Sequence, residues 1–179
     1  QVAQETVRQR GEEIGLRLNN KKCEFTSSTA QPADSIFQDF IHLAVDNAEL
    51  LGAPVTTGAA MDKALSSRCD DLERAAGRLR LLTAHDALIL LRSSFSAPKL
   101  LHTLRASPCS GHPLLERFDS QLRSCTCDIS NTDLTETQWL QASLPVRNGG
   151  VGIRRGSALA LSAFLESAAG RRRLQDEIV

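Results

Sequence analysis

The sequence predicts a mainly α-helical protein in which a small α/β segment is followed by an all-helical region. Between Met61 and Leu79, apolar residues recur every three or four positions, which is the pattern of a long amphipathic helix. Before residue 57 the apolar runs are short and are interrupted by Asn, Gly and Pro, as is typical of strands and turns. We therefore expect two parts, residues 1–57 and residues 58–179.

The composition is that of a folded domain. The chain has 179 residues, of which 41% are hydrophobic, and its 21 basic side chains balance 21 acidic ones. This length is sufficient to bury a core, and the aromatic content of only 4% means that the core must be mostly aliphatic. The even balance of charge argues against strong bulk attraction to nucleic acid.

Nothing in the sequence predicts a membrane partner. No apolar run approaches the roughly 18 residues that cross a bilayer, and Gln1–Arg17 carries charges where a signal peptide would be apolar. We expect an intracellular protein, in the nucleus or the cytoplasm. Because the chain begins with Gln1 rather than Met, in what has the pattern of a helix, we also expect a piece of a longer protein.

The first part contains short elements. Residues 1–14 predict an amphipathic helix that Gly15 ends. Leu16–Leu18 and Lys22–Phe25 alternate like strands on either side of a turn-forming Asn-Asn pair, and together they predict a hairpin. Thr26–Asp34 has the composition of an exposed loop.

Two further segments complete this part. Ile36–Asp46 fits either a strand or a helix. Glu49–Val55 is a short apolar run bounded by Gly and Pro, which predicts a buried strand.

Six helices are predicted after residue 57, each from an apolar face and a capping or starting residue. They begin near Met61, Thr83, Pro98, Pro113, Thr132 or Asp133, and Ser157. Arg147–Arg155 is expected to form a glycine-rich loop before the last helix, and the charged tail Arg171–Glu177 either continues that helix or frays.

Four residues have the chemistry of zinc ligands. Cys109 and His112 form one close pair, and Cys125 and Cys127 form another. However, the helix Leu114–Leu122 would separate the pairs by about 13 Å, at 1.5 Å per residue. Reduced cysteines without a metal are the interpretation that we favour.

Two other patterns could be read as functional sites, but an ordinary structural role explains each of them. His85-Asp86 lies near a predicted helix start, and the chain has no G-x-S-x-G motif to supply a nucleophile for a hydrolytic triad. Gly149–Gly152 precedes a helix as phosphate-binding loops do, but it follows a helix rather than a strand and lacks the Lys-Ser/Thr of a P-loop. We interpret this glycine run as a turn.

Several segments become informative when they are taken together. Gly15–Glu24 (GLRLNNKKCE) resembles the palm segment G-L-x-L-N-x-x-K-[TC]-E that follows the catalytic aspartates of reverse transcriptases. Leu50–Pro54 (LLGAP) resembles the next strand, in the primer-grip region. Trp139–Ile153 (WLQASLPVRNGGVGI), together with Pro98–Leu101 and Phe118-Asp119, resembles the region after the palm in reverse transcriptases of non-LTR, LINE-type retrotransposons. The resemblance covers nearly the whole chain, in the same order.

This resemblance implies a part of an RNA-directed DNA polymerase. Residues 1–57 would be the C-terminal edge of the palm, and residues 58–179 the helical thumb and post-thumb region. The full polymerase would use Mg²⁺ bound by aspartates that precede Gln1, since Asp70-Asp71 lies in a predicted helix and not on a strand turn. The chain would act on an RNA–DNA primer–template duplex together with the missing fingers and palm half, and would be inactive alone.

The resemblance also implies roles for individual residues. Lys22 matches the lysine that is proposed to protonate pyrophosphate. The adjacent Lys21 could be confused with it in this assignment. Leu51 and Gly52 would hold the primer end, because glycine lets a sugar–phosphate chain approach the backbone. The first thumb helix would contact the duplex, and its candidate phosphate ligands are Lys63, Arg74 and Arg78.

Other classes of function stay open at this point. The neutral net charge also fits a helical module that binds a protein partner, or an inert remnant of a mobile element. A zinc-binding module at the four Cys and His ligands is a further alternative, which elemental analysis would test.

Overall fold

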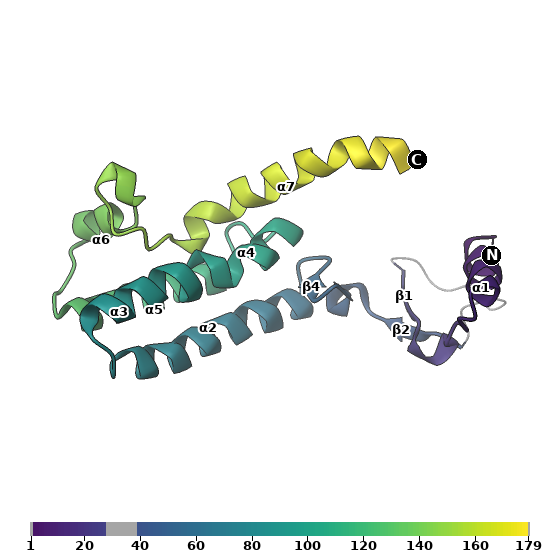
Figure 1. The fold of residues 1–179 in the computed structure, drawn as a ribbon, viewed down its shortest axis with the longest axis horizontal. Coiled ribbons are helices and arrows are strands. Elements are labelled where there is room, and N and C mark those ends of the chain that lie inside the picture. The colour runs from purple at the N-terminus through teal and green to yellow at the C-terminus, as the bar shows by residue number, and fades with distance from the viewer. Residues whose placement is uncertain (1, 28–38, 179) are drawn as a thin grey trace. The chain divides into compact units, whose positions relative to one another are not determined.

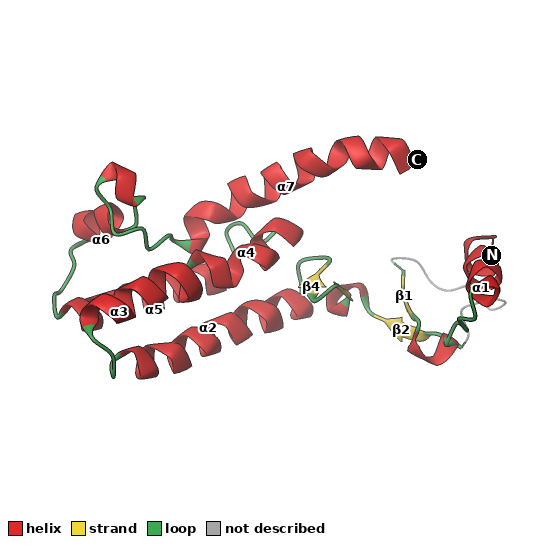
Figure 2. Ribbon diagram, viewed as in Figure 1, coloured by secondary structure: helices red, strands yellow, loops and turns green. Residues whose placement is uncertain are grey.

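The computed structural model describes residues 2–27 and 39–178 (Figure 1). The predicted fold class is confirmed, because most described residues are helical and the strands are short pairs (Figure 2). The chain divides into two compact units, Gln1–Ala48 and Glu49–Val179. The sequence placed a boundary after Thr57, which falls inside the second unit.

The first unit begins with α1 (Val2–Glu13). This helix ends as the sequence predicted, because Gly15 adopts a left-handed φ of 78° and the N–H of Leu16 donates to the carbonyl oxygen of Gly11 at 2.8 Å. The remaining elements of the unit are the 3-10 turn η1 (Asn20–Lys22), β1 (Glu24–Thr26), β2 (Ile41–Leu43) and the 3-10 turn η2 (Val45–Asn47).

The hairpin predicted over Leu16–Phe25 is wrong. Asn19 caps η1, and its Oδ1 accepts a hydrogen bond from the N–H of Lys21 at 3.2 Å, so the chain turns without bringing two strands together. β1 instead pairs in parallel with β2, which places Phe25 opposite His42. The predicted strand or helix over 36–46 is therefore partly a strand, and most of the loop predicted over 26–34 lies outside the described residues.

The second unit begins with a small hairpin, β3 (Glu49–Leu50) and β4 (Ala53–Pro54), which are antiparallel. Between them Leu51 and Gly52 both have positive φ, 52° and 74°, which is the signature of a tight type I′ turn. The predicted buried strand is confirmed only for β4, since β3 is exposed. β4 packs on α2 and α4, which explains why the hairpin belongs to the helical unit.

Helices form the rest of the second unit. They are α2 (Ala59–Leu79), α3 (Ala84–Leu90), the π turn η3 (Leu91–Phe95), α4 (Ala97–Ala106), α5 (Pro113–Ser130), α6 (Glu136–Ala142), the 3-10 turn η4 (Val146–Asn148) and α7 (Gly156–Ile178). α2 packs against α5, and α4 packs against α7 (Figure 1). The α2–α5 interface is the centre of the core, and its most buried side chains are Met61, Leu65, Leu72, Leu115, Phe118 and Leu122.

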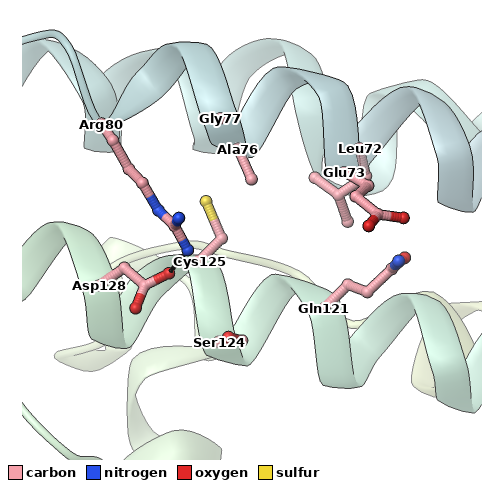
Figure 3. Close-up of a pocket in the computed structure, with 9 residues that line it drawn as sticks. All are labelled: Leu72, Glu73, Ala76, Gly77, Arg80, Gln121, Ser124, Cys125 and Asp128. Carbon is pink, nitrogen blue, oxygen red and sulfur yellow. Dashed lines mark hydrogen bonds and ion pairs between the residues drawn. The ribbon is translucent and has the colours of Figure 1, made fainter.

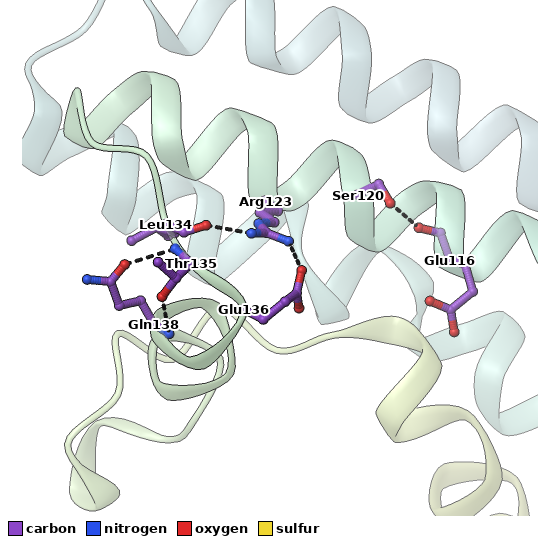
Figure 4. Close-up of polar contacts among 7 residues, drawn as sticks. All are labelled: Glu116, Ser120, Arg123, Leu134, Thr135, Glu136 and Gln138. Atoms are coloured by element: carbon purple, nitrogen blue, oxygen red, sulfur yellow. Dashed lines mark hydrogen bonds and ion pairs between the residues drawn. The ribbon is translucent and has the colours of Figure 1, made fainter.

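Most helix starts match the prediction, and one does not. Thr83 caps α3, and Pro98 and Pro113 stand in the first turns of α4 and α5. α6 is capped by Thr135, not by Thr132 or Asp133. Thr135 forms a capping box with Gln138 (Figure 4), whereas the N–H of Thr132 is used to close the end of α5 at the carbonyl of Cys127.

α7 begins on a buried carboxylate. Asp119 of α5 accepts hydrogen bonds from the N–H of Gly156 at 2.6 Å and from the N–H and hydroxyl of Ser157 at 3.1 and 2.6 Å. The side chain therefore caps α7 from a neighbouring helix. Burial raises the pKa of Asp119, and the hydrogen bonds from Ser157 and Gly156 oppose that rise. Among the described helices, none is both long enough and apolar enough to cross a membrane.

Candidate nucleic-acid interface

The three cations predicted to contact phosphate share one face of α2. At 3.6 residues per turn, Lys63, Arg74 and Arg78 lie within about 60° around the helix axis and span about 22 Å along it. All three are exposed. The three predicted phosphate contacts therefore lie on a common face of one helix.

Asp71 pairs with one of these cations, Arg74, and with two other cations. Its Oδ2 lies 3.1 Å from Lys99 Nζ and 3.3 Å from Arg68 Nη1, and its Oδ1 contacts Arg74 Nη2. The hydrogen bond from Lys99, helped by the charges of Lys99 and the two arginines, holds the pKa of Asp71 below its usual range. Three cations around one carboxylate leave the cluster with a net positive charge.

Arg78 lies one turn beyond Arg74 on α2. Within the described part of the chain, no ion-pair partner is found for its guanidinium. Arg78 is therefore available to an anionic ligand, as is Lys63, for which the described part of the chain also shows no ion pair.

The turn at Leu51 and Gly52 is fixed to α4 at two points. His102 Nε2 lies 3.2 Å from the carbonyl oxygen of Leu51, and the hydroxyl of Ser107 donates to the carbonyl of Pro54 at 2.5 Å. Since a carbonyl oxygen only accepts, His102 is the donor in the first contact. The backbone of the turn is held, whereas the Leu51 side chain is 89% exposed.

α4 connects the turn to the cations of α2. Lys99 and His102 are three residues apart on α4, so their side chains are neighbours on one face of that helix. His102 contacts Leu51, and Lys99 contacts Asp71 beside Arg74. A series of neighbouring groups therefore crosses part of the second unit, and we call it the basic strip. It consists of the turn at Leu51 and Gly52, His102, Lys99, Arg74 and Arg78.

Lys99 and His102 were not among the site residues predicted from the sequence. Both were in or next to the block Pro98–Leu101 that carries part of the resemblance, and both are polar residues on an amphipathic helix. Which neighbour each would contact depends on how α4 packs against α2 and the hairpin, and no local pattern reports that.

Lys22, the predicted catalytic residue, belongs to the first unit. It is the last residue of η1 and is exposed, as is the adjacent Lys21. The other five predicted site residues all belong to the second unit. A role for Lys22 stays a prediction.

The glycine-rich loop is a turn that closes α6. The N–H groups of Gly150, Val151 and Gly152 donate to the carbonyls of Pro145, Ala142 and Leu144. A phosphate would need such N–H groups free, so this segment does not bind phosphate in the manner of a P-loop.

Steric constraint explains the glycines of this loop. Gly150 has no room for a Cβ, which would collide with the carbonyl oxygen of Leu144. Gly149 needs a left-handed φ of 77°.

The four candidate zinc ligands are separated in the structure. Cys109 and His112 precede α5, whereas Cys125 and Cys127 lie near its other end, about 18 Å further along the helix. His112 is already engaged, because its Nδ1 accepts from the N–H of Leu114 at 3.2 Å and its Nε2 lies 3.0 Å from Asp62. Over the described ranges, no three His, Cys, Asp or Glu side chains gather as a metal site would require.

Cys125 lies in a groove between α2 and α5 (Figure 3). Burial raises the pKa of its thiol to about 11, so the thiol is a poor nucleophile at neutral pH. Arg80 and Asp128 form an ion pair across the same groove. Gly77 leaves the α2 side of the groove open, because nothing lies within 4 Å of a Cβ placed there.

Two further polar groups have structural roles. Asp86 accepts a hydrogen bond from the hydroxyl of Thr83 at 2.8 Å, and its N–H donates to that hydroxyl, so it belongs to the cap of α3. Arg123 joins α5 to the start of α6 through Glu136 and the carbonyl of Leu134 (Figure 4). Neither arrangement has the geometry of a catalytic triad.

Comparison with known proteins gives no assignment. No protein-family model matches the chain, and no curated protein or solved structure matches it.

Proposed function

We propose that this chain is the C-terminal palm and thumb region of a reverse transcriptase of the non-LTR, LINE-type retrotransposon class. Its helical unit would hold the RNA–DNA primer–template duplex during RNA-directed DNA synthesis. The proposal rests on the sequence resemblance and on one structural observation, the basic strip from Leu51 through His102 and Lys99 to Arg74 and Arg78.

The strip has the chemistry that duplex binding without sequence preference requires. Lys and Arg side chains neutralise phosphates and release counterions, and their contacts carry no base information. Arg74 and Lys99 are held in position by Asp71, so less conformational entropy is lost when a phosphate binds. The neutral net charge of the chain does not oppose this role, because the positive charge is local.

Leu51 would contribute a different contact. Its backbone has a left-handed conformation that is unfavourable for a β-branched or bulky residue by about 1 kcal/mol, and its side chain points away from the core. Gly52 beside it lets another chain come close to the backbone. This combination suits a turn that touches the end of a nucleic-acid strand.

The residues of this chain do not fit the Mg²⁺ that the full polymerase would use. Asp70-Asp71 is the one consecutive aspartate pair of the sequence. Asp71 is surrounded by Lys99, Arg68 and Arg74, which would repel a divalent cation. Catalytic metal binding is therefore expected outside this chain, and Lys22 would act only in the assembled polymerase.

Fluorescence anisotropy with a labelled RNA–DNA hybrid tests the proposal. We expect affinity that falls steeply with salt for the unaltered chain. In the triple variant Lys63→Ala, Arg74→Ala, Arg78→Ala the slope of log K against log salt should become less steep by about 2–3, because each phosphate contact contributes about 0.7–0.9. The control removes three exposed cations of the same unit that do not lie on α2, Arg117→Ala, Arg147→Ala and Arg154→Ala, and should leave the slope unchanged.

The outcomes are distinct. Absence of binding to the hybrid at low salt, or an equal loss of affinity in the triple variant and the control variant, would overturn duplex binding by the cations of α2. His102→Ala should lower the affinity for the hybrid, but by less than the triple variant does. His102→Gln keeps a donor for the Leu51 carbonyl and should therefore restore the affinity.

A further inference from the structure

A cleft lies beside the basic strip, where α2, α3, η3 and α4 meet. Its volume is about 420 Å³. Its lining has a charged part, Arg74, Arg78, Lys99 and Asp71, which we call the rim, and an apolar part, Ala75, Leu79, Leu82, Leu90 and Phe95, which we call the floor. We call it the α2–α4 cleft.

The floor exposes large apolar side chains. Leu82 is 47% exposed and Leu90 is 38% exposed, and the partly buried Phe95 stands beside them. Phe95 is the last residue of the π turn Leu91–Phe95, and such turns occur frequently at functional sites. Exposed apolar side chains gathered at one concave place indicate a site that another molecule covers.

The rim defines the charge of that molecule. Three cations and one carboxylate line the cleft, and Arg78 has no ion-pair partner in the described part of the chain. An occupant that matches this surface must carry negative charge at its edges and an apolar group at its centre.

From this pattern we propose that the α2–α4 cleft binds an acidic segment of a partner protein, which inserts a Leu or Phe side chain between Leu82, Leu90 and Phe95. Carboxylates flanking that side chain pair with Arg78 and Arg74. This mode is that of a short amphipathic peptide in a groove, in which apolar anchors give affinity and flanking charges give specificity.

A nucleic-acid backbone matches the cleft less well. Phosphates would satisfy the cationic rim, but they would leave the apolar floor in contact with water. The floor distinguishes this inference from the proposed function, which uses the rim alone. Because both ligands need Arg74 and Arg78, peptide and duplex would exclude each other, so a bound partner would release the duplex.

Selection from a random dodecapeptide library on the purified full chain tests the inference. We expect the enriched peptides to combine Asp or Glu with Leu or Phe. The peptide with the highest affinity is then labelled. Its affinity for the Leu82→Ser variant should be about tenfold lower than its affinity for the unaltered chain, because one apolar contact is lost. Leu90→Ser is a second variant, and circular dichroism checks that each variant folds.

Matched controls separate the cleft from the rest of the surface. Leu161→Ser changes a comparably exposed leucine on α7, and it should leave the affinity for the peptide unchanged. Leu82→Ser should also leave the affinity for the hybrid unchanged. A failure of the peptide proposal can therefore be distinguished from a failure of duplex binding. Unlabelled hybrid should displace the peptide.

Three results would overturn the inference. The first is enrichment of no peptide, or of peptides without acidic residues. The second is equal binding of the selected peptide to Leu82→Ser, Leu90→Ser and Leu161→Ser. The third is loss of hybrid binding in Leu82→Ser with its fold intact, which would assign the floor to a nucleobase instead.

Discussion

Asp119 Oδ1 accepts a hydrogen bond from the N–H of Gly156 at 2.6 Å, and this contact joins α5 to the first turn of α7. The carboxylate is 5% exposed and also receives two hydrogen bonds from Ser157. Gly156 also lies close to α4, because a Cβ there would be 2.6 Å from the Leu100 side chain. Asp119 thus fixes the start of α7 to α5, in addition to the packing of α7 against α4.

Replacing that residue should loosen α7. We expect Asp119→Ala to lower the free energy of unfolding by about 1–2 kcal/mol, since the N–H groups of Gly156 and Ser157 lose their acceptor. Relief of the buried charge offsets part of this loss. Urea denaturation measures the change, with the exposed Asp133→Ala as control. Equal unfolding midpoints for the two variants would show that Asp119 does not anchor α7.

The helical elements could be predicted because their signals are local. The apolar face of α2, the cap at Thr83 and the proline that opens α5, Pro113, are properties of neighbouring residues, and each was confirmed. The predicted hairpin at Leu16–Phe25 was wrong because β1 pairs with β2, a partner that is distant in the sequence. Pairing at such distances leaves no local signature.

The same distinction applies to the candidate site. Periodicity alone places Lys63, Arg74 and Arg78 on one face, since helical spacing determines the face. It does not bring Lys99 to Asp71 or His102 to Leu51, which requires α4 to pack beside α2 and β4. The site could therefore be predicted within one helix but not between helices.

Asp71 should make stability depend on pH at the acidic end. Its pKa is lowered in the folded protein, so it contributes stability above the ordinary aspartate value of 3.8 and loses that contribution as pH falls through the folded pKa. Asp71→Asn should therefore be less stable than the unaltered chain at pH 6, and this difference should shrink below about pH 4. Thermal unfolding across this range measures the effect.

The neighbouring Asp70 supplies the control for that experiment. It is exposed on the same helix, and the described structure shows no ion pair for it. Asp70→Asn should change stability little at any pH. If both variants gave the same pH profile, the ion cluster around Asp71 would not be the source of the effect.

Gly77 and Gly150 should respond in opposite ways to the same substitution. Gly77 lies inside α2 with free space around it, so Gly77→Ala should stabilise the protein by about 0.5–1 kcal/mol through helix propensity. Gly150→Ala should destabilise it by more than about 2 kcal/mol, because the new Cβ meets the backbone oxygen of Leu144 and not a movable side chain. Chemical denaturation of both variants compares them directly.

Leu51→Gly should separate stability from binding. The φ of 52° is unfavourable for leucine and acceptable for glycine, so the variant should be more stable by about 1 kcal/mol. Little packing is lost, because the side chain is almost fully exposed. If the leucine touches a nucleic-acid strand, the same variant should bind the RNA–DNA hybrid more weakly although its fold is more stable. Denaturation and anisotropy on one sample measure both quantities, and an unchanged affinity for the hybrid in a stabilised variant would show that the Leu51 side chain has no part in binding.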